Sequence, residues 1–100
     1  MNETDKEWQA SVDRVATRLL QTPVEEWDER FDYGSGTLTE DSGSWVAYFR
    51  HCPSDGSHRI AVFRDRKILF GFHKKYLNGV IAIPGEPTRL MTDEELNEYD

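Results

Sequence analysis

Residues 4–21 carry apolar side chains at the three- and four-residue spacing of a single helix face. This stripe comprises Trp8, Val12, Val15, Ala16, Leu19 and Leu20. The residue before a proline avoids helical backbone angles, so Pro23 predicts that the helix ends near Gln21. Because an amphipathic helix is stable only when its apolar face is buried, the rest of the chain must supply an apolar surface for it.

A second, shorter helix is predicted directly after Pro23. Val24, Trp27 and Phe31 recur at a spacing of three and four, and we expect Trp27 and Phe31 to anchor the segment inward. The outward face is strongly acidic and consists of Glu25, Glu26, Asp28, Glu29 and Asp32. Near the other end of the chain, Thr92 followed by Glu95 matches a capping box, which predicts a further short helix.

The centre of the chain has the composition of β-strands. Trp45–His51 is rich in aromatic and β-branched residues, and the segments 59–63, 67–72 and 80–83 have the same character, with a short strand at Leu38. The short connection between the second and third of these segments predicts a tight turn at Asp65–Arg66. Residues 73–79 fit either a hairpin that turns at Asn78–Gly79 or one helical turn capped by Gly79.

Helices followed by grouped strands predict an α+β fold in a single domain that spans residues 1–100. In this fold the N-terminal amphipathic helix and the short helix pack on an antiparallel meander of four or five strands, and a short helix ends the chain. Connections of a few residues cannot join parallel neighbours, so the sheet is predicted to be antiparallel.

The residue types that carry chemistry do not occur at the spacings that chemistry requires. His51, Cys52, His58 and His73 are the best metal ligands, but they form no pair at zinc-ligand spacing. Cys52 lacks the neighbouring groups that activate a thiol as a nucleophile. The glycine- and serine-rich loops match neither a nucleophile elbow nor a phosphate-binding loop. We therefore expect no metal, no cofactor and no enzymatic activity.

Three features favour a cytoplasmic location. The single cysteine cannot form an internal disulfide, and no apolar run approaches the ~20 residues that a membrane span needs. The acidic segment 1–7 lacks the basic and apolar regions of a signal peptide. The sequence therefore predicts a cytoplasmic protein without a membrane partner, as a monomer or a small homo-oligomer.

Charge is distributed unevenly along the chain. The segment 59–75 carries a net charge of +5, whereas the whole chain carries −7 and the remainder therefore −12. Dense carboxylates steer association with cationic surfaces. We therefore expect a protein-binding module in which the acidic face from Glu25 to Asp32 covers a basic surface of a partner protein, as inhibitors, immunity proteins, anti-defence proteins and other regulators can do.

An alternative is nucleic-acid binding through the basic, aromatic hairpin of residues 59–76. Its cations are Arg59, Arg64, Arg66, Lys67, Lys74 and Lys75. Aromatic residues lie among these cations, as base-stacking surfaces require, but the negative net charge opposes attraction of phosphates at long range. A third arrangement, in which the acidic helix lies across the basic hairpin, would leave neither charge available to a partner.

Overall fold

The computed structural model describes residues 3–100, and its first element is the long helix α1 (Glu3–Gln21). The predicted apolar stripe faces the sheet, with Val12, Val15, Ala16 and Leu19 fully buried. A 3-10 turn, η1 (Val24–Glu26), and a single helical turn, α2 (Trp27–Arg30), follow after Pro23. None of the helices in residues 3–100 is long and apolar enough to cross a membrane.

Five antiparallel strands form one sheet in sequence order, as a meander. They are β1 (Gly34–Thr39), β2 (Trp45–His51), β3 (His58–Lys67), β4 (His73–Ala82) and β5 (Arg89–Leu90). The α+β fold with an antiparallel meander is therefore confirmed.

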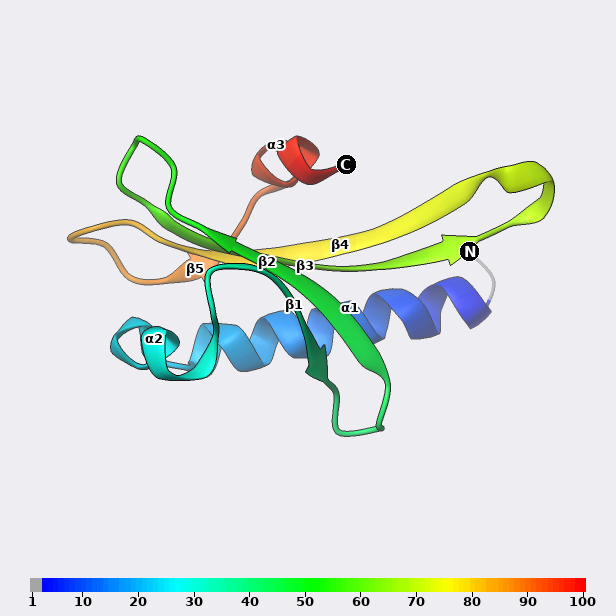
Figure 1. Ribbon diagram of the computed structural model, residues 1–100, viewed down its shortest axis with the longest axis horizontal. Coiled ribbons are helices and arrows are strands. Elements are labelled where there is room, and N and C mark those ends of the chain that lie inside the picture. The colour runs from blue at the N-terminus through cyan, green and yellow to red at the C-terminus, as the bar shows by residue number, and fades with distance from the viewer. Residues whose placement is uncertain (1–2) are drawn as a thin grey trace.

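Both faces of the sheet are covered, although unequally (Figure 1). Helix α1 lies along one face, where its stripe packs against Val46, Ile60, Val62 and Val80. The C-terminal segment, α3 (Asp93–Leu96) and η3 (Asn97–Tyr99), lies over the opposite face. A smaller cluster forms there from Ala61, Ile81, Met91, Ile83, Leu96 and Tyr99. The capping box of Thr92 and Glu95 is present at the start of α3, as predicted.

The predicted turn at Asp65–Arg66 is wrong. Strand β3 continues to Lys67, and Asp65 pairs with Lys75 inside the sheet. The chain reverses at residues 68–72 instead, so β3 and β4 form a long hairpin that extends beyond the N-terminal end of α1 (Figure 1). Asp5 of α1 pairs with Arg66 and Lys74, two like charges that face each other across the strands. A contact from a distant helix thus favours continued strand pairing where the local sequence suggested a turn.

Residues 73–79 form neither the predicted hairpin turn nor a helical turn. Strand β4 runs straight through Asn78 and Gly79, and Gly79 pairs with Ala61 of β3. Gly79 is buried beneath Met91, whose N–H donates to the Gly79 carbonyl at 2.9 Å. The glycine therefore permits a close approach of chain segments rather than a reversal.

Candidate interaction surfaces

The predicted acidic helix is a short segment fixed to one end of the sheet. Its apolar residues Trp27 and Phe31 point inward, as predicted, and are 0% and 7% exposed. The Trp27 indole N–H donates to the carbonyl of Thr22 at 3.2 Å, which ties the segment back to the end of α1. Because the helix is one turn long, these buried side chains rather than helical hydrogen bonding hold it in place.

Arg50 of β2 is the residue that joins this segment to the sheet. It is 3% exposed and donates to the Phe31 carbonyl and to the Asp28 carboxylate, both at 2.7 Å. Its guanidinium also lies 4.0 Å from the centre of the Tyr33 ring. Nothing in the local sequence identifies this role, because the contacts of Arg50 lie about 20 positions earlier in the chain.

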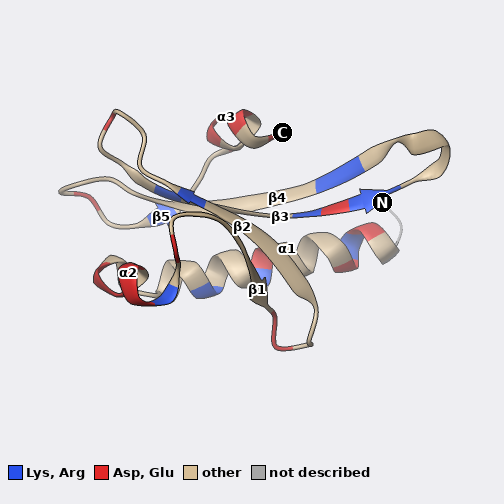
Figure 2. Cartoon of the chain, viewed as in Figure 1, with Lys and Arg blue, Asp and Glu red and all other residues tan. Residues whose placement is uncertain are grey.

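The five carboxylates of the predicted acidic face divide into two groups. Asp28 pairs with Arg50, and Glu26 pairs with Arg30 at 3.2 Å. Glu25, Glu29 and Asp32 are exposed and make no ion pair with any residue in the described chain. We call these three carboxylates the acidic end. They lie at the opposite end of the molecule from the turn of the β3–β4 hairpin, so the acidic helix does not cover the cations near that turn (Figure 2).

Most of the basic residues of segment 59–76 have partners within the molecule. Arg59 is only 8% exposed and pairs with Asp55 at 3.0 Å and with Glu98 at 3.5 Å. The Arg64 guanidinium lies 3.9 Å from the centre of the Trp8 ring.

The outer cations of the hairpin are also engaged, with one exception. Arg66 and Lys74 share Asp5, as described above, and Lys75 donates to the carbonyl of Tyr99 at 2.9 Å. The Lys67 side chain is exposed and has no hydrogen bond or ion pair with residues 3–100. The six predicted cations thus do not form one free basic surface.

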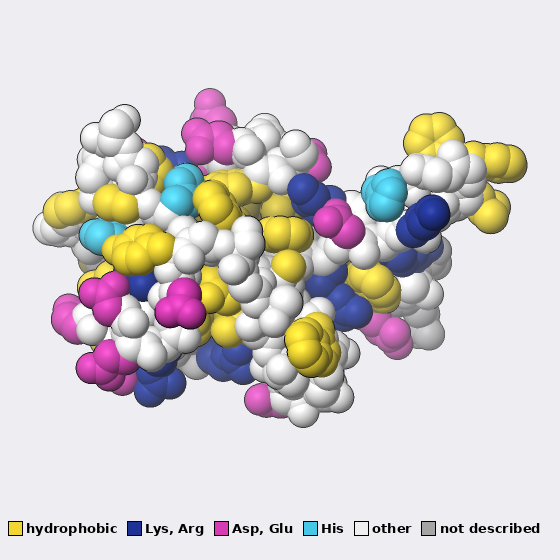
Figure 3. Space-filling model, in the orientation of Figure 1, with side chains coloured by type: hydrophobic (Ala, Val, Ile, Leu, Met, Phe, Trp, Pro, Cys, Tyr) yellow, Lys and Arg dark blue, Asp and Glu magenta, His cyan; other side chains and the backbone are white. Residues whose placement is uncertain are grey.

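The end of the same hairpin carries the two most exposed large apolar residues in the described part of the chain, Leu69 and Phe70. Leu69 is 79%, Phe70 93% and Phe72 66% exposed, and Ile68 lies beside them. We call these four residues the apolar tip; Figure 3 shows it as a yellow cluster at the end of the projecting hairpin. Sequence reasoning missed this surface, because 67–72 has the composition of a core strand. Gly71 is the signal that could have located the turn there.

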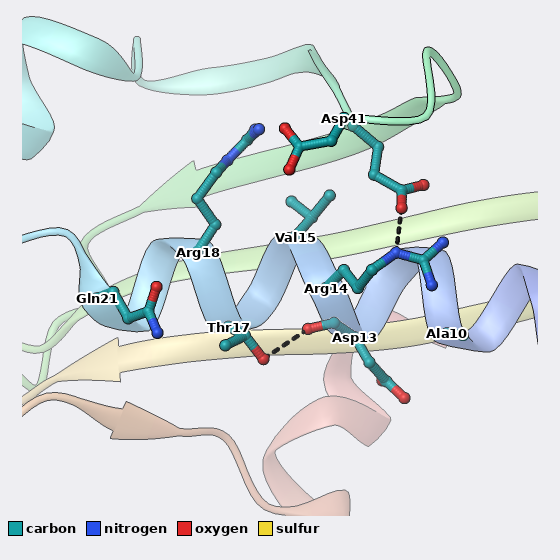
Figure 4. A pocket seen from close by; sticks show the side chains of 9 residues that line it. Ala10, Asp13, Arg14, Val15, Thr17, Arg18, Gln21 and Asp41 are labelled. Atoms are coloured by element: carbon teal, nitrogen blue, oxygen red, sulfur yellow. Dashed lines mark hydrogen bonds and ion pairs between the residues drawn. The ribbon is translucent and has the colours of Figure 1, made fainter.

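A groove of about 520 Å³ runs between α1 and the β1–β2 turn (Figure 4). Glu40, which is 6% exposed, accepts hydrogen bonds there from Arg14, Ser11 and Ser42. The hydrogen bond from Arg14 is the main reason that the pKa of Glu40 falls to about 2. Arg18 donates to the Thr39 carbonyl at 3.0 Å. Because these charges satisfy one another, we assign the groove a structural role: it ties α1 to the sheet.

The residues considered for catalysis or metal binding do not assemble into a site. His51 contacts the Tyr99 hydroxyl, and burial together with the nearby Arg59 charge lowers the pKa of His51. Cys52 is exposed, and His73 lies at the opposite end of the molecule, next to the apolar tip. Within residues 3–100, no three side chains of the metal-ligating types lie close enough to hold an ion.

Comparisons of the chain with protein-family models, with characterised proteins and with solved structures gave no match. The acidic end and the apolar tip are the two candidate interaction surfaces of the described chain.

Proposed function

We propose that this chain is a small acidic protein-binding module whose acidic end covers a basic surface of a partner protein. Such a contact would block or regulate the partner, as an inhibitor, immunity protein or anti-defence protein does. The observation that carries the proposal is the separation of charge: Glu25, Glu29 and Asp32 make no ion pair with described residues and lie far from the cations near the turn of the β3–β4 hairpin (Figure 2).

The rigid attachment of the acidic end favours recognition. Trp27 and Phe31 are buried below it, and Arg50 holds its backbone through the Phe31 carbonyl. A surface that is already ordered loses little conformational entropy when it binds. Carboxylates held in this way would accelerate encounter with a cationic partner, and the rate would fall as salt is added.

The test is a triple charge reversal, Glu25→Lys, Glu29→Lys and Asp32→Lys. The partner is first captured from nuclease-treated native lysate, identified and purified, and its Kd is then measured by calorimetry. We expect the triple variant to bind at least about tenfold more weakly, because each substitution replaces attraction to the basic surface with repulsion. Asp28 is left unchanged because it pairs with Arg50.

A matched control reverses three exposed carboxylates elsewhere, Glu7, Glu94 and Asp100. Each triple variant raises the net charge by the same amount, so a loss of binding confined to the first variant would assign the contact to the acidic end. Equal affinity for both variants, each shown by circular dichroism to be folded, would refute the proposal.

Nucleic-acid binding through residues 59–76 is the alternative, and the same capture experiment decides it. Nucleic acid that is captured from untreated lysate but not after nuclease treatment would favour this alternative. The logarithm of its binding constant should then fall linearly with the logarithm of the salt concentration. The pairing of Arg59, Arg66 and Lys74 with the molecule's own carboxylates leaves few cations for phosphates. The proposal of a protein partner is therefore the better supported of the two.

A further inference from the structure

The apolar tip is exposed without any structural need for its exposure. Phe70 is 93% exposed and packs against neither core cluster, and Leu69 and Phe72 are also mostly in solvent. The four apolar side chains are contiguous and lie at the end of a projecting hairpin (Figure 3). Contiguous apolar patches on monomeric proteins commonly mark contacts with a membrane or another protein.

The backbone of the tip presents Phe70 at an energetic cost. Phe70 has φ of 64° and Gly71 has φ of 79°, so both central residues of the turn are left-handed. The Phe72 N–H donates to the Leu69 carbonyl at 3.4 Å, and the Ile68 N–H donates to the Phe72 carbonyl at 2.7 Å. Hairpin turns of this kind favour asparagine before glycine, and a bulky residue there is an outlier. Neither burial nor turn preference explains a phenylalanine, which points to an external ligand.

Basic residues lie directly behind the tip on both strands. Lys67 pairs with His73 in the register, and the next pair is Arg66 with Lys74. Successive residues of a strand are ~3.3 Å apart, so these cations lie within a few ångströms of the apolar side chains along the hairpin. Residues 68–72 contain no side chain that can form a hydrogen bond. Polarity therefore changes along the hairpin, from an apolar tip to charged residues behind it, of which Lys67 is exposed and has no side-chain partner among residues 3–100.

We infer that the apolar tip inserts into the interface of an anionic lipid bilayer, with the exposed Lys67 facing the headgroup phosphates. A bilayer has the same one-dimensional order, with acyl chains below a layer of negative charge. A protein pocket is the less suitable occupant, because such pockets use a few polar groups to orient the ligand and the tip offers none.

Most of the net charge of −7 lies away from this contact, and the nearby Asp5 is paired with Arg66 and Lys74. The molecule is 44 Å long, and the acidic end lies far from the tip (Figure 2). Screening at physiological ionic strength acts over ~8 Å, so the distant carboxylates interact weakly with a surface at the tip. The expectation of no membrane partner rested on the lack of a spanning segment, and insertion of a loop needs none.

The test is co-sedimentation with vesicles of phosphatidylcholine alone or of equal parts phosphatidylcholine and phosphatidylglycerol. We expect the parent chain to bind the anionic vesicles and Phe70→Asn to bind at least about tenfold more weakly, because it removes a large apolar side chain from the lipid. Lys67→Glu should weaken binding to anionic vesicles only. Trp45→Asn is the matched control, since it removes another exposed aromatic residue, 66% exposed, that lies away from the tip.

A direct reading of insertion comes from Phe70→Trp. The fluorescence of the new tryptophan is obtained by subtracting the emission spectrum of the parent chain from that of the variant. This emission should shift to shorter wavelength with anionic vesicles and be quenched by lipids brominated near the headgroup. No binding by the parent chain, or equal binding by Phe70→Asn, would overturn the inference. Loss of a protein partner or of self-association in Phe70→Asn, without any vesicle binding, would also overturn it. The charge-reversal variants of the acidic end are read with a protein partner, so failure of either proposal is distinguishable from failure of the other.

Discussion

Gly79 lies where the packing of the sheet leaves no room for a side chain. A Cβ atom built there would lie 2.7 Å from the carbonyl oxygen of Ile60 and would overlap the end of Met91. We expect Gly79→Ala to lower the free energy of unfolding by about 1–3 kcal/mol, because a close-packed core must shift to admit a methyl group. Urea denaturation monitored by circular dichroism measures the change.

The double variant Gly79→Ala with Met91→Ala separates the two clashes. The Met91 side chain is flexible and can move, whereas the Ile60 carbonyl belongs to the neighbouring strand and cannot. The cost of the double variant should therefore be less than the sum of the single costs. A Gly79→Ala variant as stable as the parent would show that β3, β4 and Met91 do not approach each other this closely.

Phe70 is an exposed residue whose backbone conformation lowers the stability of the fold. Its left-handed backbone is unfavourable for phenylalanine and acceptable for asparagine. We expect Phe70→Asn to raise the free energy of unfolding by about 1 kcal/mol, because it relieves backbone strain without removing a buried contact. Phe70→Leu, which keeps a bulky side chain in the same turn, should bring no gain. A lower melting temperature for Phe70→Asn would mean that Phe70 packs against the molecule itself.

At the scale of elements, the acidic end depends on a single arginine of β2. Arg50→Ala would leave the Phe31 carbonyl and the Asp28 carboxylate without their partner and would open space beside Trp27. We expect a loss of about 2–3 kcal/mol, because the variant removes the packing of a buried side chain and leaves the Phe31 carbonyl without its hydrogen-bond donor. Hydrogen exchange of residues 27–34 should accelerate more than exchange in β3.

Asp28→Asn is the comparison for this variant. The Asp28 side chain is 78% exposed, so its ion pair contributes little and its loss should cost no more than about 1 kcal/mol. If the two substitutions had the same effect, the ion pair rather than the buried guanidinium would hold α2 to the sheet.

Elements that are determined by residues close together in the sequence were predictable from it. The stripe of α1, the strand Trp45–His51 and the capping box at Thr92 each depend on residues within one element. The reversal between β3 and β4 was misplaced because its position depends on Asp5, about 60 residues away, and Gly79 was misread because Met91 covers it. The acidic residues were identified, but not which of them pair with Arg30 and Arg50.

At the scale of the whole molecule, two glutamates tie elements to opposite faces of the sheet. Glu40 joins α1 to the β1–β2 turn through Ser11 and Arg14. Glu95 caps α3 and accepts two hydrogen bonds from Arg89, at 2.8 and 3.0 Å. The hydrogen bonds from the arginines are the largest cause that lowers the pKa of each carboxyl, to about 2 from an ordinary value of 4.5.

These lowered pKa values predict how stability depends on pH. Between pH 4.5 and about 2 the unfolded chain binds protons at Glu40 and Glu95 that the folded chain does not, so acid favours unfolding. Their contribution is fully present above pH 4.5 and is lost as the pH falls through the folded pKa values. Urea midpoints measured from neutral pH to pH 2 should therefore decrease most steeply in this interval.

The double variant Glu40→Gln with Glu95→Gln tests this origin of the acid sensitivity. Neither glutamine titrates, so the variant should be less stable at neutral pH and its midpoint should depend less on pH below 4.5. A residual slope should remain, because the pKa values of Asp5 and Asp55 are lowered as well, chiefly by hydrogen bonds from Tyr76 and Ser57. Glu94→Gln, at an exposed position without an ion pair in the described chain, is the matched control for removing a carboxylate from α3. An undiminished acid slope in the double variant would show that other carboxylates account for acid unfolding and that α1 and α3 are not held to the sheet in this way.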